Sequence, residues 1–486
     1  MTRVKHDYSL IVLAALVSHV TALSAGFIWL DHAHLEDGLA LAPDGDFLAL
    51  FRGGFAGTGY YRPLMSVSLS LDAALGGSPF IYHSFTLLFH AGAAALVSVA
   101  ALSLGLSRRV AFGAALLFAV HPLSSLVANA VAFRSESMLA AALLGLIVLH
   151  QRGKIWLSAL LLLAGALTKE TALALGPLFI LVLELFPAAP RREAAGRRLQ
   201  LLGAEGAALA LAIVLRSAYA PDWRAQHTAL PLGEALGTRL AAITKSAWAL
   251  LLPIDNGVCD AFSITQFSAA SALLGAGLLL GAAYLAYRRR GPALLLLVAL
   301  LPSLQLVPVM RWWSPHYLYL PLAFAAMVAV EAVERWAEGA LRWVPPLALA
   351  LGGLSLLEAG RYQNDERFWG RELELEPACR EAHYFLGDVA QSAGRFDDAV
   401  EHYEQALAAR PALLSYVDRA AALQNLGVAQ LQQRQFEGAS RTFREALALN
   451  LDEKARGRVQ HNLAAAEMLS RSTAREVSGT DGGERR

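Results

Sequence analysis

Long apolar segments, separated by short polar breaks, fill roughly the first three quarters of the chain. A helix needs roughly 20 apolar residues to cross the hydrocarbon core of a bilayer. The pattern therefore predicts about eleven membrane-spanning helices, some of them short. They lie near 8–30, 83–106, 109–127, 136–150, 155–168, 171–187, 199–218, 267–287, 292–310, 316–334 and 343–358.

The pattern changes after residue 358, where the chain becomes rich in Glu, Arg, Gln and Ala. We predict an all-α protein with two domains, a polytopic membrane helix bundle over 1–358 and a soluble helical domain from 359 onward. Two long polar breaks interrupt the membrane part. They are 31–82 and 219–261, and the second contains a stretch that fits a helix lying in the membrane interface.

Small and aromatic residues recur in a fixed order in the soluble part. One set is Leu386-Gly387, Ala399, Tyr403, Ala406 and Pro411, and a second is Leu426-Gly427, Ala439, Phe443 and Ala446. Both fit the tetratricopeptide pattern of roughly 34 residues, in which small residues let paired helices approach and aromatic residues fill the seam. We predict a tetratricopeptide-repeat α-solenoid over 359–469, which would bind a peptide or protein, and a disordered tail, 470–486. A generic array of helical hairpins is the alternative.

The charge of the short breaks predicts the orientation. Five of them are basic, and cytoplasmic loops of membrane proteins carry an excess of Arg and Lys. All five are cytoplasmic if the N-terminus is cytoplasmic and 219–261 begins and ends outside. The five basic breaks contain Arg3 with Lys5, Arg108-Arg109, Arg152 with Lys154, Arg191-Arg192 with Arg197-Arg198, and Arg288-Arg289-Arg290.

The same count of crossings brings the remaining ionisable breaks to the outer face, together with the whole C-terminal domain. These breaks are 31–82, Arg134 with Glu136, Lys169 with Glu170, 219–261, and Arg311 to His316. Charged residues at membrane depth usually face a cavity or a partner rather than lipid. We therefore expect chemistry at the outer membrane surface.

Composition narrows the class of protein. Hydrophobic residues make up 56% of the chain and charged residues 17%, as in a membrane protein, and a net charge of +1 gives no reason to expect nucleic acid as a partner. The long apolar run after Met1–Lys5 fits an uncleaved signal anchor. Cys259 and Cys379 indicate neither a disulfide framework nor a metal motif. The Ala-, Leu- and Arg-rich composition suggests a bacterial inner membrane.

Six short motifs follow one another along the membrane part. They are Asp31 after the first span, Tyr61-Arg62-Pro63-Leu64, Tyr82-His83 with His90, His121-Pro122 with Phe133-Arg134-Ser135-Glu136, Thr168-Lys169-Glu170-Thr171, and Tyr317-Leu318-Tyr319-Leu320-Pro321. This ordered set, with repeats at the C-terminus, resembles the transmembrane and tetratricopeptide-repeat-containing O-mannosyltransferases and their bacterial relatives, of the GT-C class. The resemblance implies a GT-C-like bundle that moves a sugar from a polyprenyl phosphate to an acceptor.

The resemblance makes Asp31 the candidate catalytic base, since a carboxylate at the membrane exit can take the proton of an acceptor hydroxyl. Glu36 and Asp37 are the second candidates. The group of His32, His34, Glu36 and Asp37 also offers ligands for a divalent metal, although clustered polar residues in a loop are usually just solvated. No cofactor is certain.

Four cations are candidates for contact with the lipid phosphate: Arg62, Arg134, Lys169 and His316. A guanidinium binds phosphate through two parallel hydrogen bonds. Structural roles stay open for two of the four. Lys169 and Glu170 fit an interfacial ion pair, and Arg62 fits an anchor to lipid headgroups.

We therefore expect a membrane glycosyltransferase that uses a polyprenyl-phosphate-linked sugar at the outer face, with the repeats binding a protein acceptor. The chain departs from the family pattern where a second Asp is replaced by His32, where Ser124-Ser125-Leu126 lacks an acidic residue, and where His316 replaces Arg. These departures keep a second interpretation open, a non-catalytic membrane scaffold whose repeats assemble envelope proteins.

Overall fold

The computed structural model forms two compact units, Met1–Val258 with Ile264–Asn364, and Cys259–Ser263 with Asp365–Arg486. Every regular element among the residues that the structure describes is a helix, which confirms the all-α prediction. Those residues are 2–188, 194–220, 232–254, 256–259, 268–289, 291–304, 311, 313–408 and 417–480.

The first unit is a bundle of apolar helices joined by short turns. Its α-helices are α1 (Thr2–Ser18), α2 (Pro63–Ala74), α3 (Pro79–Ser103), α4 (Arg108–Val120), α5 (Ser125–Asn129), α6 (Arg134–Gln151), α7 (Ile155–Thr168), α8 (Thr171–Leu185), α9 (Ala195–Tyr219), α10 (Leu232–Leu251), α11 (Ala269–Arg289), α12 (Pro292–Ala299), α13 (Tyr319–Trp336) and α14 (Val344–Ala359).

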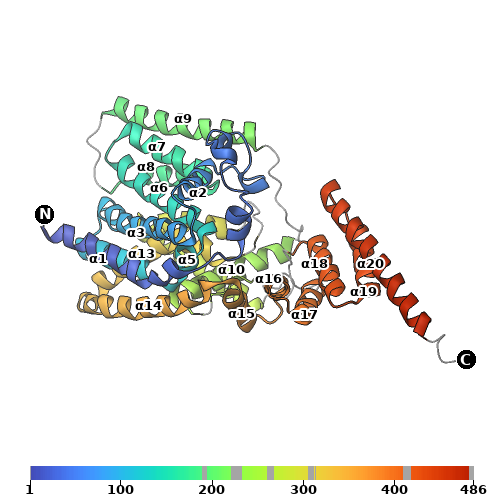
Figure 1. Cartoon of the computed structure of the whole chain (residues 1–486). Helices are drawn as coiled ribbons and strands as arrows, with labels where there is room; N and C mark the ends of the chain where they lie inside the picture. Colours follow the sequence, from blue (N-terminus) through green and yellow to red (C-terminus); the bar gives the residue numbers. More distant parts are fainter. Residues whose placement is uncertain are drawn as a thin grey trace, which may run out of the picture. The chain divides into compact units, whose positions relative to one another are not determined.

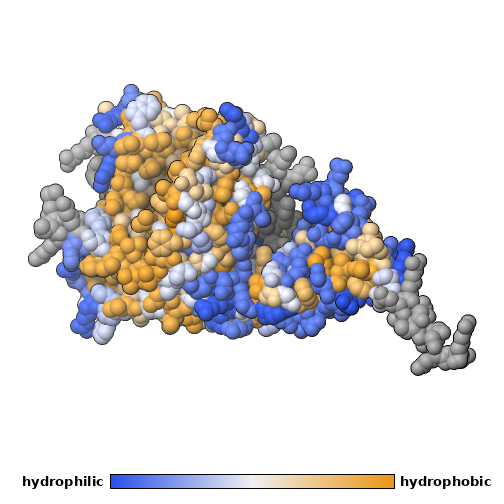
Figure 2. Space-filling view, in the orientation of Figure 1, coloured by the Kyte–Doolittle hydropathy of each residue, from blue (hydrophilic) through white to orange (hydrophobic). Residues whose placement is uncertain are grey.

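The centre of this bundle is α3, which packs against α1, α4 and α6, while α7 lies between α6 and α9 (Figure 1). Small residues permit these close approaches, as is usual between membrane helices. At Gly176 of α8, for example, an added β-carbon would lie only 2.3 Å from Cδ1 of Leu162 on α7. Apolar side chains such as Trp156, Leu273 and Leu349 remain exposed, and hydrophobic residues cover much of the visible face of this unit (Figure 2).

Six helices in the described part of the chain are long and apolar enough to cross a membrane, or seven if the bent pair α4 and α5 counts as one span. Three shorter apolar helices, His6–Ser18, Ile155–Thr168 and Thr171–Leu185, accompany them. Each of the eleven predicted spans contains a helix, but the first helix ends at Ser18 rather than at residue 30. The number of membrane crossings thus stays a prediction.

The two ends of the bundle are distinct. Arg134, at the start of α6, donates to the carbonyl oxygen of Tyr82 near the start of α3 (2.7 Å), and Ser103, at the end of α3, donates to Gln151 at the end of α6 (3.1 Å). These two helices therefore run in the same direction. We call the end that holds Arg134 and the 31–82 segment the first-loop end.

The opposite end, which we call the basic end, carries Arg108 and Arg109. These two residues pair with Asp7 and Glu338 at N–O distances of 2.6 and 2.5 Å. The ionisable breaks with Arg62, Glu136 and Lys169 lie at the first-loop end, away from these basic residues, because successive helices alternate in direction. The predicted sorting of breaks between two faces is thus matched by the ends of the bundle. Arg191, Arg192 and Arg290 of the basic breaks lie outside the described residues.

The second unit contains the repeat helices α15 (Asp365–Leu375), α16 (Arg380–Ser392), α17 (Phe396–Leu407), α18 (Arg419–Gln432), α19 (Phe436–Leu447) and α20 (Glu453–Thr480). Gly387 and Gly427 let the buried rings of Tyr403 and Phe443 approach to positions only 2.6 and 2.5 Å from where a β-carbon would stand. Predicted Pro411 lies outside the described residues. The tail predicted to be disordered is helical as far as Thr480.

The prediction that the two cysteines form no disulfide is wrong. Cys259 and Cys379 are joined by a disulfide, with their α-carbons 5.8 Å apart. The backbone N–H of Cys259 also donates to the buried Glu372 carboxylate (3.0 Å). A separation of 120 residues hides such a pair from any spacing motif, because only the folded chain brings the two cysteines together.

Candidate functional site

Asp31 is buried at the first-loop end, where the chain leaves the turn that follows α1. Its Oδ1 accepts the backbone N–H of Ala132 (2.6 Å), and its Oδ2 accepts longer bonds from Val131 and Ile28 (both 3.4 Å). The turn between α5 and α6 thus supplies donors to a carboxylate from the first loop. Trp29, two residues earlier, holds a left-handed conformation with φ of 51°, which costs a bulky residue about 1–3 kcal/mol and persists because the surrounding packing maintains it.

Burial raises the pKa of the Asp31 carboxyl from 3.8 to about 7, even though the three backbone N–H groups favour the charged form. A carboxylate with a pKa near neutrality is matched to general acid–base work at neutral pH. The side chain has no exposed surface in this conformation, so an acceptor hydroxyl reaches it only if the neighbouring loop opens.

The other two predicted carboxylates, Glu36 and Asp37, are exposed. Glu36 pairs with Nδ1 of His32 at 2.5 Å, on the same helical turn. His34 turns away to pack edge-on against Phe55, and burial lowers its pKa to about 4, with the charge of Arg62 as the second cause. In the part of the chain that the structure describes, no three His, Cys, Asp or Glu side chains are arranged to hold a metal ion.

Arg62 stands just before α2, where its Nε donates to Oε2 of Glu170 (3.0 Å). The guanidinium lies against the ring of Tyr60, 4.3 Å from the centroid, and the other oxygen of Glu170 accepts the N–H of Tyr61 (2.8 Å). Within the described residues, only Nε of Arg62 makes a hydrogen bond. Two terminal nitrogens of a held, largely buried cation therefore remain able to bind an anion.

A cavity of about 290 Å³ borders Arg62. Small and apolar residues of the first loop, between Gly38 and Ala56, line most of its wall, and Ser66 of α2 adds a polar side chain. A cavity of this size lies at the lower end of the range for small-molecule sites. It therefore has room for a headgroup beside Arg62 but not for a long hydrocarbon chain.

Lys169 and His316 meet at Glu136, at the start of α6. Nζ of Lys169 makes a short hydrogen bond to Oε1 of Glu136, and Nε2 of His316 lies 3.7 Å from the same oxygen. Burial lowers the pKa of Lys169, and Glu136 only partly opposes this. The predicted pairing of Lys169 with its neighbour Glu170 is replaced by this pairing across the bundle, because Glu170 binds Arg62 instead.

Arg311 belongs to the same group, although it was predicted only to lie in an outer break, with no role at the site. Its guanidinium lies over the ring of Trp29, 4.8 Å from the centroid, and His316 interacts electrostatically with Arg311, Lys169 and Arg62. The short spacing between Arg311 and His316 was the signal for its proximity. We call Arg62, Lys169 and Arg311 the cation cluster, and the imidazole of His316 lies beside it.

Arg134, the remaining residue predicted to bind phosphate, lies away from the cation cluster and has other partners. Its side chain has no exposed surface, and it pairs with Asp72 of α2 at 2.5 Å. It also donates to Thr86 (3.0 Å) and to the carbonyl of Tyr82. These contacts tie α2, α3 and α6 together, which indicates a structural role rather than contact with a substrate.

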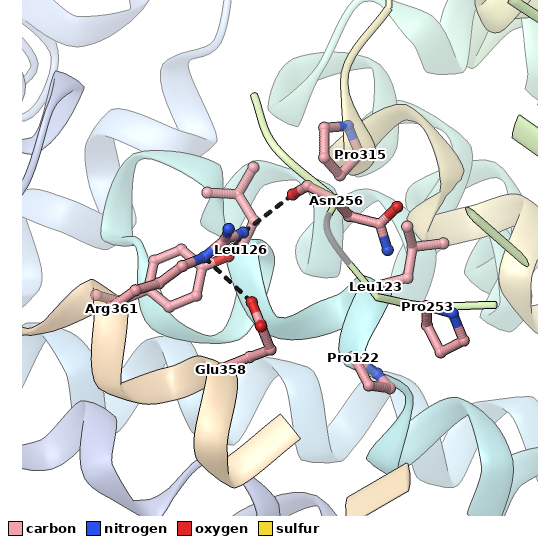
Figure 3. Close-up of a pocket in the computed structure, with 9 residues that line it drawn as sticks. Pro122, Leu123, Leu126, Pro253, Asn256, Pro315, Glu358 and Arg361 are labelled. Atoms are coloured by element: carbon pink, nitrogen blue, oxygen red, sulfur yellow. Dashed lines mark hydrogen bonds and ion pairs between the residues drawn. The ribbon is translucent and has the colours of Figure 1, made fainter. Parts of the chain in front are cut away.

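A second hollow, beside Pro122, is much smaller. Figure 3 shows Arg361 paired with Glu358 at its edge, and Arg361 also donates to the carbonyl of Asn256 (3.0 Å). Its volume is about 10 Å³, which is room for about one water molecule. The bundle is therefore tightly packed around the turn after α4, and this hollow has no space for a sugar.

The site thus combines one buried carboxylate with a group of cations at the same end of the bundle. Asp31 and the cation cluster are separated by Trp29 and Phe133, whose ring centroids lie 5.2 Å apart, and Phe133 in turn contacts His316 at 4.7 Å. Arg62 is paired with Glu170 and Lys169 with Glu136, and Arg311 lies near them beside Trp29 and His316. Guanidinium and ammonium groups gathered at one place are suited to binding phosphate.

Comparison with known proteins adds two findings. The tetratricopeptide-repeat family matches residues 379–452, which contain the α16–α17 and α18–α19 hairpins. The chain is also similar to Protein O-mannosyl-transferase TMTC3 of Mus musculus, at 30% identity over 139 residues, and to Protein O-mannosyl-transferase Tmtc1 of Drosophila melanogaster, at 30% identity over 181 residues.

These matches cover 27% and 33% of this chain, and they span only 15% and 20% of the two relatives. No solved structure matches the chain. Apolar helices, tetratricopeptide repeats and the two similar curated proteins agree with the family resemblance seen in the motifs. The chain is therefore a membrane protein with tetratricopeptide repeats that is similar to the TMTC O-mannosyl-transferases.

Proposed function

We propose that this protein is a glycosyltransferase of the GT-C class, which moves a sugar from a polyprenyl phosphate to a hydroxyl group of a protein. The observation that carries the proposal is the cation cluster, which lies at the same end of the bundle as the buried carboxylate of Asp31. Similarity to proteins named O-mannosyl-transferases supports the class of reaction.

In the proposed reaction, Asp31 and the cation cluster have different tasks. Asp31 takes the proton of the acceptor hydroxyl as its oxygen forms a bond to the anomeric carbon of the sugar. The bond from that carbon to the phosphate oxygen breaks, and the electron pair leaves with the polyprenyl phosphate. Arg62, Lys169 and Arg311 offset the charge on the leaving phosphate, where low dielectric makes each ion pair strong.

We further propose that the first-loop end faces the outside of a bacterial inner membrane. The basic residues Arg108, Arg109 and Lys154 are at or beside the opposite end, as expected for a cytoplasmic face. The Cys259–Cys379 disulfide supports the same orientation, because disulfides persist outside the cytoplasm and are rare within it.

The repeats are proposed to bind the acceptor protein. Their two matched hairpins form a short solenoid, and solenoids of this type present extended surfaces to peptides and proteins. Transfer to one acceptor would then require both the bundle and the repeats.

The proposal is tested with full-length protein in proteoliposomes that contain a radiolabelled polyprenyl-phosphate hexose and envelope proteins from cells that lack this protein. We expect label to move to protein, and we expect a chain truncated after Gly360, with Cys259→Ser to remove the unpaired thiol, to bind the donor without labelling the native acceptor. Normal labelling by the truncated chain would show that the repeats do not select the acceptor.

One observation favours the second candidate function, a non-catalytic scaffold. Asp31 has no exposed surface and accepts three backbone hydrogen bonds, as a carboxylate with a purely structural role would. A scaffold would bind envelope proteins through its repeats and would bind no lipid-linked sugar. Failure of both full-length and truncated chains to bind the donor would therefore favour the scaffold.

A further inference from the structure

Ser66 of α2 has a hydroxyl group that makes no hydrogen bond within the residues that the structure describes. The residue is only 4% exposed, and it lines the cavity of about 290 Å³, which we call the first-loop cavity. The other two serines of α2 are bonded: Ser68 donates to the carbonyl of Met65 (2.9 Å), and Ser70 accepts the N–H of Ala42 (2.8 Å). Because buried hydroxyl groups nearly always have a partner, Ser66 points to a ligand in the cavity.

The wall of the first-loop cavity favours an anion as that ligand. Among the described residues that line it, Arg62 is the one with a charged side chain. Ser66 follows Arg62 by one helical turn, and its backbone N–H donates to the carbonyl of Arg62 (3.2 Å). Residues at this spacing are neighbours on a helix surface. A guanidinium and a hydroxyl group are thus neighbouring donors at one cavity.

The start of α2 adds to this preference. The helix begins at Pro63, which also lines the cavity, and the side chain of its N-cap residue, Arg62, makes no capping hydrogen bond. The positive end of a helix dipole attracts phosphate. Arg62 is held in place by Glu170 (Nε to Oε2, 3.0 Å) and by the ring of Tyr60, so its guanidinium is oriented before a ligand arrives.

One apolar core supports both the first-loop cavity and the carboxylate of Asp31. Phe55, in the wall of the cavity, belongs to this core together with Met65 of α2 and Val131. The backbone N–H of Val131 donates to Oδ2 of Asp31 (3.4 Å). An anion in the cavity and the candidate base are therefore held by the same packed residues, which favours a fixed geometry between reacting groups.

We propose that the first-loop cavity holds the phosphate group of the donor, and that Ser66 is a specificity-determining residue that donates a hydrogen bond to it. This inference rests on the proposed function, because it names the place and a further ligand of the phosphate that the transfer reaction releases. The two terminal nitrogens of Arg62 donate to oxygens of the same phosphate. A free phosphate ion has the same chemistry, so the experiment compares both sources.

The test measures binding of geranylgeranyl phosphate, a short polyprenyl phosphate without sugar, to the full-length protein in nanodiscs. We expect Ser66→Ala to weaken binding about 10- to 100-fold, the usual effect of losing one hydrogen bond to a charged group. The control is Ser84→Ala on α3, because the Ser84 hydroxyl donates to the carbonyl of Phe80 (2.6 Å) and does not line the cavity. That variant should bind within about twofold of the natural protein, and equal losses in both variants would overturn the role of Ser66.

Thermal unfolding without ligand separates a role in binding from a role in the fold. Ser66→Ala should unfold at the same temperature as the natural protein or slightly above it, because it removes a buried hydroxyl group that has no partner within the described residues. Ser70→Ala should unfold at a lower temperature, because it leaves the N–H of Ala42 without its acceptor. If Ser66→Ala loses as much stability as Ser70→Ala, the hydroxyl group serves the fold and the inference is wrong.

Inorganic phosphate distinguishes the two sources of the ligand and separates this inference from the proposed function. We expect millimolar phosphate to displace geranylgeranyl phosphate while binding more weakly than the lipid does. If both bind equally tightly and Ser66→Ala weakens both, the cavity holds phosphate but the lipid-linked donor is contradicted. If Ser66→Ala weakens neither, the inference is wrong while the proposed donor stands. Absence of geranylgeranyl phosphate binding by the natural protein would count against both.

Discussion

At the scale of single residues, the carboxyl group of Asp31 is buried, yet it accepts three backbone N–H groups. Burial disfavours the charged form and dominates, so the pKa of Asp31 rises from 3.8 to about 7. The hydrogen bonds keep the group oriented whichever form it takes. A base held in this way is ready to accept a proton near neutral pH, provided that the loop above it opens.

This pKa predicts a pH dependence of stability with a definite sign. Between pH 4 and 7 the folded protein holds a proton on Asp31 that the unfolded chain releases, so the stability that this group contributes is lost as pH rises through about 7. Thermal unfolding in detergent should therefore show the natural protein losing stability relative to Asp31→Asn between pH 5 and pH 8. A stability difference between the two proteins that is the same at pH 5 and pH 8 would show that the pKa of the Asp31 carboxyl is not raised.

Arg62 allows a sharper test of the proposed phosphate site than Lys169, because two of its nitrogens make no hydrogen bond within the described residues. Removing a charge-assisted hydrogen bond costs about 1.5–3 kcal/mol, so Arg62→Met should weaken binding of a polyprenyl phosphate by roughly 10- to 150-fold. Equilibrium binding in nanodiscs measures this effect.

The matched control is Arg52→Met, because Arg52 is exposed on the same loop. That variant should bind within about twofold of the natural protein, since it removes the same charge from an exposed side chain that does not line the cavity. Equal losses in both variants would indicate general attraction of the anion to the loop rather than a site at Arg62.

At the scale of elements, the sequence predicted a helix for every span and every repeat hairpin, because apolar runs and the small–aromatic repeat pattern depend on local spacing. It did not reveal α2, which lies inside the predicted first loop. As a result, Asp72 was not recognised as the partner of Arg134, and Arg134 was predicted to bind phosphate. Partners that meet across several turns depend on the fold, and local patterns do not contain them.

The close packing of glycine against an aromatic ring in each repeat hairpin predicts which substitution lowers the stability of the hairpin. A methyl group added at Gly387 would stand 2.6 Å from the buried ring of Tyr403, so Gly387→Ala should destabilise α16 and α17 by about 1–3 kcal/mol. Hydrogen exchange of peptides from these helices should quicken accordingly in the full-length protein.

Gly438 on α19 is the control, because the nearest atoms to an added methyl group there belong to the Gln430 side chain at 3.7 Å. Gly438→Ala should leave exchange unchanged or slow it slightly, since alanine favours a helix over glycine. The seam explanation is wrong if the two substitutions have the same effect.

At the scale of the whole molecule, the proposed transfer reaction requires the first-loop end of the bundle to face out. The sorting of basic residues away from the cation cluster follows from the alternation of helices, and the sequence could predict it by counting crossings. The disulfide could not be predicted in this way, and it now contributes its own argument for an oxidising compartment. Two independent physical arguments, charge and redox chemistry, thus favour one orientation.

Single cysteines placed in a Cys259→Ser, Cys379→Ser background test this orientation directly. Asp398→Cys on α17 and Lys154→Cys at the basic end both replace exposed residues. A membrane-impermeant maleimide should label Asp398→Cys in intact spheroplasts and should label Lys154→Cys only after lysis. The reverse pattern would invert the orientation and move the transfer site to the cytoplasmic face.

The most direct test of the central claim is the rate of sugar transfer from a polyprenyl-phosphate hexose by the natural protein, by Asp31→Asn and by Asp44→Asn, in proteoliposomes over a range of pH. Asp44 lies exposed on the same loop with a φ of 49°, which asparagine also tolerates, so its variant is the matched control. We predict that the natural protein and Asp44→Asn transfer sugar at rates that rise through about pH 7, and that Asp31→Asn is slower by roughly 10²–10⁴-fold. Full activity of Asp31→Asn would contradict the assignment of the base, and absence of transfer by the natural protein would contradict the proposed function.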